Sequence, residues 1–150
     1  MKKIIFRNFQ SPGDIVKLTA AVRDLHQCHP NQFLTDVRTP FPELWEHNPY
    51  ITPLDESDPD VEAMEAHYPL IHQSNELPYH FLFGFSDYFN QQLNLNIRPQ
   101  AYRGDLYLSA EERALPSPDQ DIAGLDRPYC IIASGGKFDF SINWWDFNRY

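Results

Sequence analysis

One acidic residue, Asp14, stands where a strand-like segment passes into a helix-like one. An apolar run over Lys3 to Phe9 precedes it, and Ser11-Pro12-Gly13 forms a turn that ends at the acid. In open α/β sheets, ligands bind outside the carboxyl ends of the strands, so this carboxylate is a candidate for acid–base chemistry. The alternative is structural, because an Asp at a helix start accepts backbone N–H bonds and complements the helix dipole.

Three neighbours of this acid, Asn8, Ser11 and Gly13, are expected to contact the same ligand. Gly13 has no side chain, so the backbone there can approach a ligand closely. The amides of Gly13 and Asp14, at the start of the expected helix, could also hydrogen-bond an anionic group. The turn therefore offers a ligand both a carboxylate and backbone donors.

A second polar segment, residues 67–80, is rich in His, Tyr and Pro. We expect His67, Tyr68, His72 and His80 to line a ligand cleft at the same sheet edge as the acidic turn. An ordinary surface loop, in which the rings pack and cap, is the alternative. The three histidines are spaced 5 and 8 residues apart. Zinc sites use closer pairs, so no metal is expected.

A third candidate is the Gly-rich turn Ser134-Gly135-Gly136-Lys137, which follows an apolar strand-like run. Backbone amides and a cation in such a turn can bind phosphate, and a tight turn with a solvated Lys is the alternative. Cys28 and Cys130 lack the spacing of metal ligands. We expect both to be reduced packing residues.

Strand-like and helix-like segments alternate around these candidates. After the first strand, we predict a helix over 15–28, a strand over 32–37, a short helix over 42–47, strands over 50–54 and 61–66, and an aromatic helix over 81–93. The 61–66 pattern also allows a helix, but its alternation favours a strand. Ser109 with Glu111 and Glu112 predicts a further helix start. The order predicts an α/β fold with a Rossmann-like parallel sheet flanked by helices.

Charge and length narrow the function further. The chain has 150 residues and a formal net charge of −9, with only 12 Lys and Arg. Nucleic acids and anionic membranes are therefore unlikely partners on electrostatic grounds, since Lys and Arg supply most of such binding. No run approaches the roughly 20 apolar residues of a membrane span, and the basic start leads into a strand, not a signal-peptide core. A cytoplasmic protein is expected.

The Pro-rich stretch that begins at Pro116 predicts a domain boundary. We expect a Rossmann-like domain over 1–115, a linker over 116–127, and the first strand and loop of another domain over 128–150. This last part forms an aromatic carboxy-terminal extension, because it contains five Phe and Trp residues and two Tyr residues.

Two stretches of the chain are similar to a known family. Residues 11–26, SPGDIVKLTAAVRDLH, and residues 37–51, VRTPFPELWEHNPYI, resemble the amino-terminal half of the ADP-heptose:lipopolysaccharide heptosyltransferases. The resemblance runs from residue 2 to about residue 146, with its most specific motifs in the first 50 residues. These enzymes are GT-B glycosyltransferases, in which the first of two Rossmann-like domains binds the acceptor and the second binds the nucleotide sugar.

The resemblance implies roles for individual residues. Asp14 matches the acid taken as the general base in that family, and residues 134–137 match the loop on the donor-phosphate side. The family places a Lys directly before a Trp in this region, where this chain has Asn143. A cation that would stabilise the leaving diphosphate is missing there. A nucleotide sugar such as ADP-heptose would be the co-substrate, with no metal or other cofactor.

Two functional hypotheses follow. The first is a heptosyltransferase-type domain that binds a saccharide acceptor but is incomplete for catalysis alone, because the chain ends within the first elements of the donor half. The second is a non-enzymatic interaction module, derived from a degenerate transferase, that binds a protein partner or forms a homo-oligomer through the aromatic 138–150 tail. A nucleotide-binding oxidoreductase domain is disfavoured, because no G-x-G-x-x-G follows the first strand.

Overall fold

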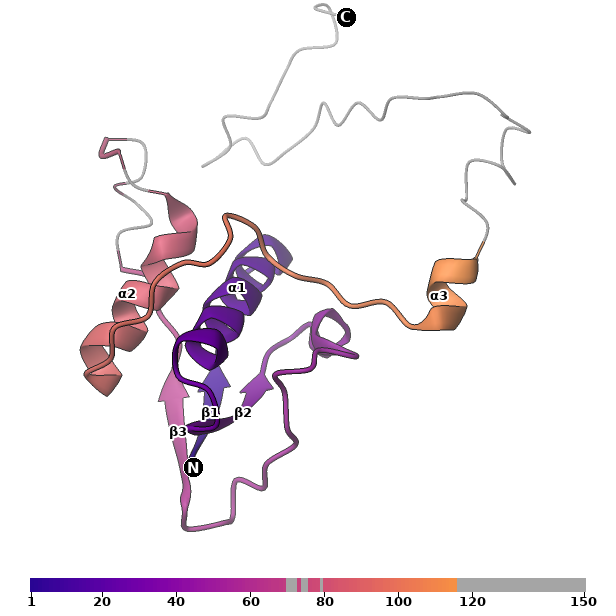
Figure 1. Ribbon diagram of the computed structural model, residues 1–150, viewed down its shortest axis with the longest axis horizontal. Coiled ribbons are helices and arrows are strands. Elements are labelled where there is room, and N and C mark those ends of the chain that lie inside the picture. Colours follow the sequence, from indigo (N-terminus) through magenta and orange to yellow (C-terminus); the bar gives the residue numbers. More distant parts are fainter. Residues whose placement is uncertain (70–72, 74–75, 79, 116–150) are drawn as a thin grey trace, which may run out of the picture. The chain divides into compact units, whose positions relative to one another are not determined.

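A computed structural model describes residues 1–69, 73, 76–78 and 80–115 of the chain (Figure 1). Met1–Arg113 form one compact unit, which contains the sheet and its helices. A second unit begins at Ala114 and lies almost wholly outside the described residues. The linker expected over 116–127 and the segment expected over 128–150 are therefore also outside them.

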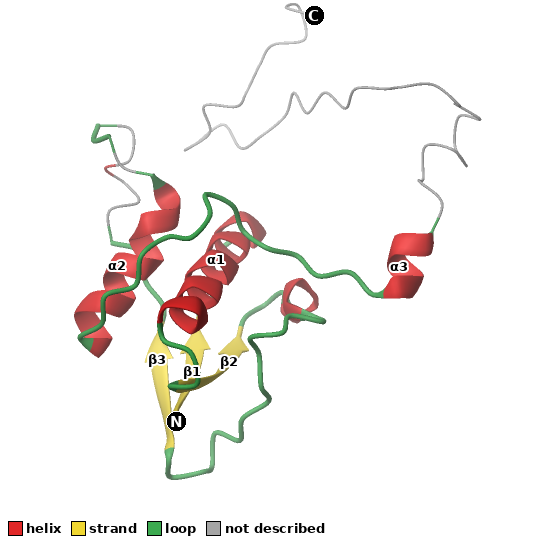
Figure 2. Cartoon of the chain, viewed as in Figure 1, coloured by secondary structure: helices red, strands yellow, loops and turns green. Residues whose placement is uncertain are grey.

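The sheet has three parallel strands in the order β2-β1-β3 (Figure 2). They are β1 (Lys2–Arg7), β2 (Phe33–Arg38) and β3 (Val61–Glu65), and β1 pairs in parallel with both neighbours. The predicted α/β class and parallel sheet are confirmed, as is the choice of a strand at 61–66. Because all three strands run the same way, their carboxyl ends meet at one edge.

The strand predicted over 50–54 is wrong. Only one isolated bridge forms there, between Thr35 and Ile51. Side chains take the backbone donors on either side, because the Tyr50 amide donates to Asn48 Oδ1 at 3.0 Å and the Leu54 amide donates to Asp36 Oδ2 at 2.8 Å. Pro53 has no N–H to contribute. The segment therefore cannot continue a ladder.

Helix α1 (Pro12–Cys28) begins three residues earlier than expected. Ser11 is its N-cap and Pro12 its first residue, a position where the fixed φ of proline suits a helix and its missing N–H is not needed. Gly13 and Asp14 therefore lie in the first helical turn. The apolar face includes Ile15, Leu18, Val22 and Leu25, all fully buried in one core with Ile4 and Phe6 of β1.

Helix α2 (Phe81–Leu93) packs against α1 and contributes to the same core. The Phe89 ring stacks on Phe6 of β1, with ring centres 4.4 Å apart. Asn94 ends the helix in the left-handed conformation, with φ of 52°. The predicted aromatic helix is confirmed, and its Phe85 and Phe89 rings lie in the core.

Among the described residues, an extended segment between β2 and β3 contacts the opposite face of the sheet. Lys3 pairs with Asp58 at 2.7 Å, and Arg7 pairs with Glu56 at 2.9 Å. Arg38 donates to the Leu54 carbonyl at 2.9 Å. The chain between β2 and β3 is thus fixed to this face by polar contacts.

Two short helices complete the described unit. The helix expected over 42–47 is a 3-10 turn, η1 (Pro42–Trp45), and α3 (Ala110–Ala114) begins after Ser109. The Ser109 amide donates to Glu112 Oε2 at 2.7 Å, and the Glu112 amide donates to Ser109 Oγ at 3.0 Å. This reciprocal pair is a capping box and confirms the predicted helix start.

Candidate functional site

The carboxyl ends of β1 and β3 are joined by Asn8. This residue is 3% exposed, and its Nδ2 donates to the Ala66 carbonyl at 2.8 Å. It also exchanges hydrogen bonds with Gln10, and the Ala66 amide donates to the Arg7 carbonyl. Asn8 was expected to contact ligand, but its groups are used to hold the two strand ends together. The residues that follow each strand are brought to one place as a result.

Asp14 lies at this edge, in the first turn of α1, and receives three side-chain donors. Ser11 Oγ donates to Oδ2 at 2.6 Å, and Tyr68, which follows β3, donates its hydroxyl to Oδ1. Lys17 Nζ is 3.3 Å from the same Oδ1. A carboxylate has about four acceptor positions, so one on Oδ2 is left over from these three donors. The acidic turn and Tyr68 of the 67–80 segment thus come together at this edge of the sheet.

The charge of Asp14 is set by two opposing effects. Burial would raise the pKa of the carboxyl, but the hydrogen bonds from Ser11 and Tyr68 and the charge of Lys17 outweigh it, so the pKa lies below its ordinary value. Burial, together with the hydrogen bond and charge of Asp14, raises the pKa of Tyr68. Asp14 is therefore an ionised acceptor held by neutral and cationic donors. A general base for a sugar hydroxyl works best when its pKa is raised toward the working pH, which is the opposite of the shift at Asp14.

The simple capping alternative for Asp14 is not what forms. Its carboxylate takes its hydrogen bonds from side chains, and Ser11, the N-cap, makes no side-chain cap bond. The Asp14 amide donates to the Ser11 carbonyl at 2.9 Å. The expectation that this amide would bind an anion is therefore wrong. The charge still complements the helix dipole, because it lies in the first turn.

Gly13, the residue before Asp14, faces open space. A Cβ built on Gly13 meets nothing within 4 Å, so neither packing nor backbone strain requires glycine there. The preceding loop carries Phe9, which is 69% exposed, and Phe81 at the start of α2 is 37% exposed. Lys17 Nζ lies 4.3 Å from the centre of the Phe81 ring. The open side thus has charged and aromatic neighbours.

Tyr68 acts on Asp14 from the interior. It is 3% exposed, and its ring lies 4.5 Å from that of Phe85 on α2. A Cβ on Gly84 would be 2.6 Å from Tyr68 Cβ, which is closer than real Cβ contacts, so the glycine makes room for the tyrosine. Sequence reasoning assigned Tyr68 to ligand binding. Its position instead suits it to orient the carboxylate.

The histidines of the second candidate are dispersed. His67 is exposed and packs edge-on against Tyr88, with ring centres 5.4 Å apart. His80 caps α2, because its Nδ1 accepts from the Leu82 amide at 3.3 Å, and its ring contacts Tyr102. This matches the alternative in which the rings pack and cap. His72, the 134–137 turn, Cys130 and Asn143 lie outside the described residues.

Two residues at the site were missed by sequence reasoning. Lys17 stands three residues after Asp14 in the helix, a spacing that places both side chains on one face and could have been noticed. Phe81 gives no local signal, because its place depends on how α2 packs beside α1. Within the described residues, no group of three or more His, Cys, Asp or Glu is placed to hold a metal ion.

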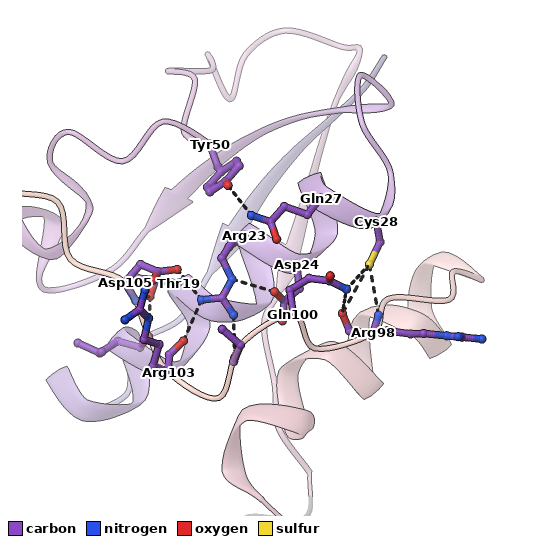
Figure 3. A network of polar contacts seen from close by, with 12 residues as sticks. Thr19, Arg23, Asp24, Gln27, Cys28, Tyr50, Arg98, Gln100, Arg103 and Asp105 are labelled. Atoms are coloured by element: carbon purple, nitrogen blue, oxygen red, sulfur yellow. Dashed lines mark hydrogen bonds and ion pairs between the residues drawn. The ribbon is translucent and has the colours of Figure 1, made fainter.

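A second polar cluster, which we call the Arg23 cluster, lies further along α1 (Figure 3). Arg23 is 6% exposed and contacts Asp24 at 2.8 Å and Asp105 at 2.6 Å. It also donates to the carbonyls of Arg103 and Ala101, each at 2.9 Å. These contacts hold the segment after α2 against α1. Because Arg23 is almost fully buried, the cluster presents little surface to a ligand.

A cavity of about 290 Å³ opens near the end of β2. It is lined by Asp36, Val37, Arg38, Thr39, Pro42, Trp45, Glu46 and Ile51. Its Asp36 and Arg38 side chains bond to each other at 2.7 Å and to the Leu54 backbone. Two of the three charged side chains in the lining, Asp36 and Arg38, are therefore already paired.

Together, the fold and site define a small α/β domain with three parallel strands and an ionised, partly accessible carboxylate at their carboxyl edge. No protein-family model matches the chain, and neither the curated proteins nor the solved structures include a significant match. Of the helices in the described part of the chain, none has the length and apolar character needed to cross a membrane.

Proposed function

We propose that this chain is a glycosyltransferase-like domain of the heptosyltransferase type. It binds a saccharide acceptor at the carboxyl edge of its sheet, for transfer of a sugar from a nucleotide-sugar donor. The observation that carries the proposal is the Asp14 carboxylate, which is ionised, has an acceptor position left over and lies beside the open space at Gly13. The role fits a cytoplasmic protein of lipopolysaccharide biosynthesis, as the sequence resemblance implies.

The surroundings of Asp14 suit a saccharide. Sugar hydroxyls donate hydrogen bonds to carboxylates, and their apolar C–H faces pack on aromatic rings. The exposed Phe9 and Phe81 rings supply such surfaces on the elements that carry or border the acid. A few polar groups among aromatic side chains are the usual composition of a small-molecule site.

In this proposal, Asp14 first orients the acceptor and only then serves as base. A hydroxyl would donate to the remaining position on Oδ2, beside Ser11. Because the present donors lower the pKa of Asp14, proton transfer to it requires that one of them withdraw. Movement of Ser11 toward solvent would remove one of the hydrogen bonds that lower the pKa of the carboxyl and make it a better base.

The proposal is tested by titrating the protein with a panel of saccharides and nucleotide sugars, including ADP-heptose, while recording amide NMR shifts and calorimetric heat. We expect saturable binding by a saccharide, with shifts at residues 9–17, and a loss of at least about tenfold in affinity for Asp14→Asn. Asp60→Asn, which removes one exposed acid elsewhere, is the matched control. Equal affinities for wild type and Asp14→Asn, or no binding by any member of the panel, would contradict the proposal.

A second candidate function, an interaction module, is favoured by exposed apolar side chains after α2. Tyr102, Leu106 and Leu108 are all more than half exposed. Exposed apolar patches mark protein contacts more often than single apolar residues do. If these residues mediate assembly, sedimentation will show an oligomer that becomes monomeric in the Leu106→Ser, Leu108→Ser double variant. A monomeric wild type would contradict this second function.

A further inference from the structure

The ammonium group of Lys17 occupies a cage beside the Asp14 carboxylate. Its Nζ is 3.3 Å from Asp14 Oδ1, 4.3 Å from the centre of the Phe81 ring and 5.7 Å from the centre of the Tyr68 ring. One anionic group and two aromatic rings thus surround one cation. All three cage residues come from different segments: the start of α1, the start of α2 and the chain after β3.

A carboxylate with aromatic faces is the arrangement by which proteins recognise alkylammonium ligands. The cage can be reached from solvent, because the Lys17 side chain is 29% exposed and Phe81 is partly exposed. The formal net charge of −9 also favours the approach of a cation over that of an anion. The same carboxylate and rings could therefore bind the ammonium group of a ligand in place of that of Lys17.

We propose that the Asp14 site takes an amino-bearing saccharide, whose ammonium group occupies the position now held by Lys17. The proposal rests on the saccharide-binding function above and narrows its substrate class. Lys17 acts as an internal occupant that keeps the carboxylate paired when no ligand is bound. The open space at Gly13 leaves room for the sugar ring beside the cage.

Lys17 is well suited to leave. Its bond to Asp14 is the longest of the three that the carboxylate receives from side chains, and lysine has a long flexible stem. Ser11 and Tyr68 remain in place when it leaves, so the carboxylate keeps its orientation. An incoming ammonium restores the charge pair that Lys17 gives up.

The test compares glucosamine with N-acetylglucosamine, which share a ring but differ in the positive charge. At mildly acidic pH, where the amine is protonated, we expect glucosamine to bind wild type at least about tenfold more tightly. Lys17→Met removes the internal ammonium and keeps a long apolar side chain, so it should tighten glucosamine binding several-fold. Lys2→Met, on the exposed start of β1, removes the same charge elsewhere and should change the affinity less.

The outcomes separate this inference from the function on which it rests. Equal affinities for the two sugars, with binding that still depends on Asp14, overturn the amino-sugar inference and leave saccharide binding intact. Binding of neither sugar overturns this inference, and failure of the whole saccharide panel also overturns the proposed function. Butylammonium binding as tightly as glucosamine supports the cation cage but overturns its assignment to a saccharide. The wild-type comparison is decisive even if Lys17→Met folds poorly.

Discussion

The Asp14 site and the Arg23 cluster are both built on α1, yet one is open and the other is closed. Arg23 is 6% exposed and places its guanidinium on two carboxylates and two backbone carbonyls. Asp14 has three side-chain donors, a remaining acceptor position and open space at the neighbouring Gly13. Four of the five guanidinium N–H groups of Arg23 are bonded within the fold and the side chain is buried, so this residue stabilises the fold. A group with a position left over can also serve a ligand.

The largest effect that tests this comparison is expected from Arg23→Met. The substitution leaves Asp24 and Asp105 without their cation, and removing one partner of a buried pair costs about 3 to 5 kcal/mol. Urea unfolding followed by circular dichroism measures the change. Arg113→Met, at an exposed position in α3, is the control. If both variants lose the same small amount, the Arg23 cluster is not what holds the segment after α2.

Tyr68→Phe should have a smaller effect on stability and a specific effect on charge. Loss of the hydroxyl removes one hydrogen bond to an ionised group, worth about 1.5 to 3 kcal/mol. The pKa of Asp14 should rise, because a donor that favours its charged form is gone. Carboxyl-carbon NMR titration measures it. Tyr102→Phe, on an exposed ring, should leave the pKa of Asp14 unchanged.

The Asp14 carboxylate should also make the free energy of unfolding depend on pH. The pKa of Asp14 is lower in the folded state than in the unfolded state, so its contribution is present above the ordinary carboxyl pKa and is lost as pH falls through the folded value. Asp55 and Asp58, whose pKa values are also lowered, act in the same direction. Asp14→Asn should therefore make unfolding less steeply dependent on acid than in wild type. If the stability of wild type and of Asp14→Asn depends on pH in the same way, Asp14 does not have the lowered pKa assigned to it.

The smallest effect on stability is expected from Gly13→Ala. The added methyl group meets no atom, and alanine is the better helix former by up to about 1 kcal/mol within a helix, less at its first turn. Thermal unfolding should shift slightly upward, while saccharide affinity should fall because the methyl group occupies the open side. Ala20→Gly, within the buried part of α1, should instead lower stability. Unchanged affinity in Gly13→Ala would place the ligand elsewhere.

Much of the fold could be predicted because its elements carry strong local patterns. The strands at 2–7 and 33–38 and the helix at 81–93 have the apolar runs or apolar faces that burial requires. The strand expected over 50–54 failed for one local reason and one that is not local. Asn48 and Asp36 take the amides that a ladder would need, and Asp36 is distant in sequence from Leu54.

The site could be predicted in position but not in character. A parallel sheet places the turn after β1 and the chain after β3 at one edge, which is why Asp14 and Tyr68 meet. The direction of the pKa shift of Asp14 depends partly on its local neighbours Ser11 and Lys17 and partly on Tyr68, which is 54 residues away in the sequence. The burial of Tyr68 depends on a glycine 16 positions later in the chain.

That glycine ties the interior of α2 to the electrostatics of the site. Any larger side chain at Gly84 would displace Tyr68, and with it one of the hydroxyls that lower the pKa of Asp14. A substitution in the hydrophobic core would then change the titration of a carboxylate on another helix. Over evolutionary time, the packing of α2 and the charge environment of Asp14 cannot vary independently, because the absence of a side chain at Gly84 affects both.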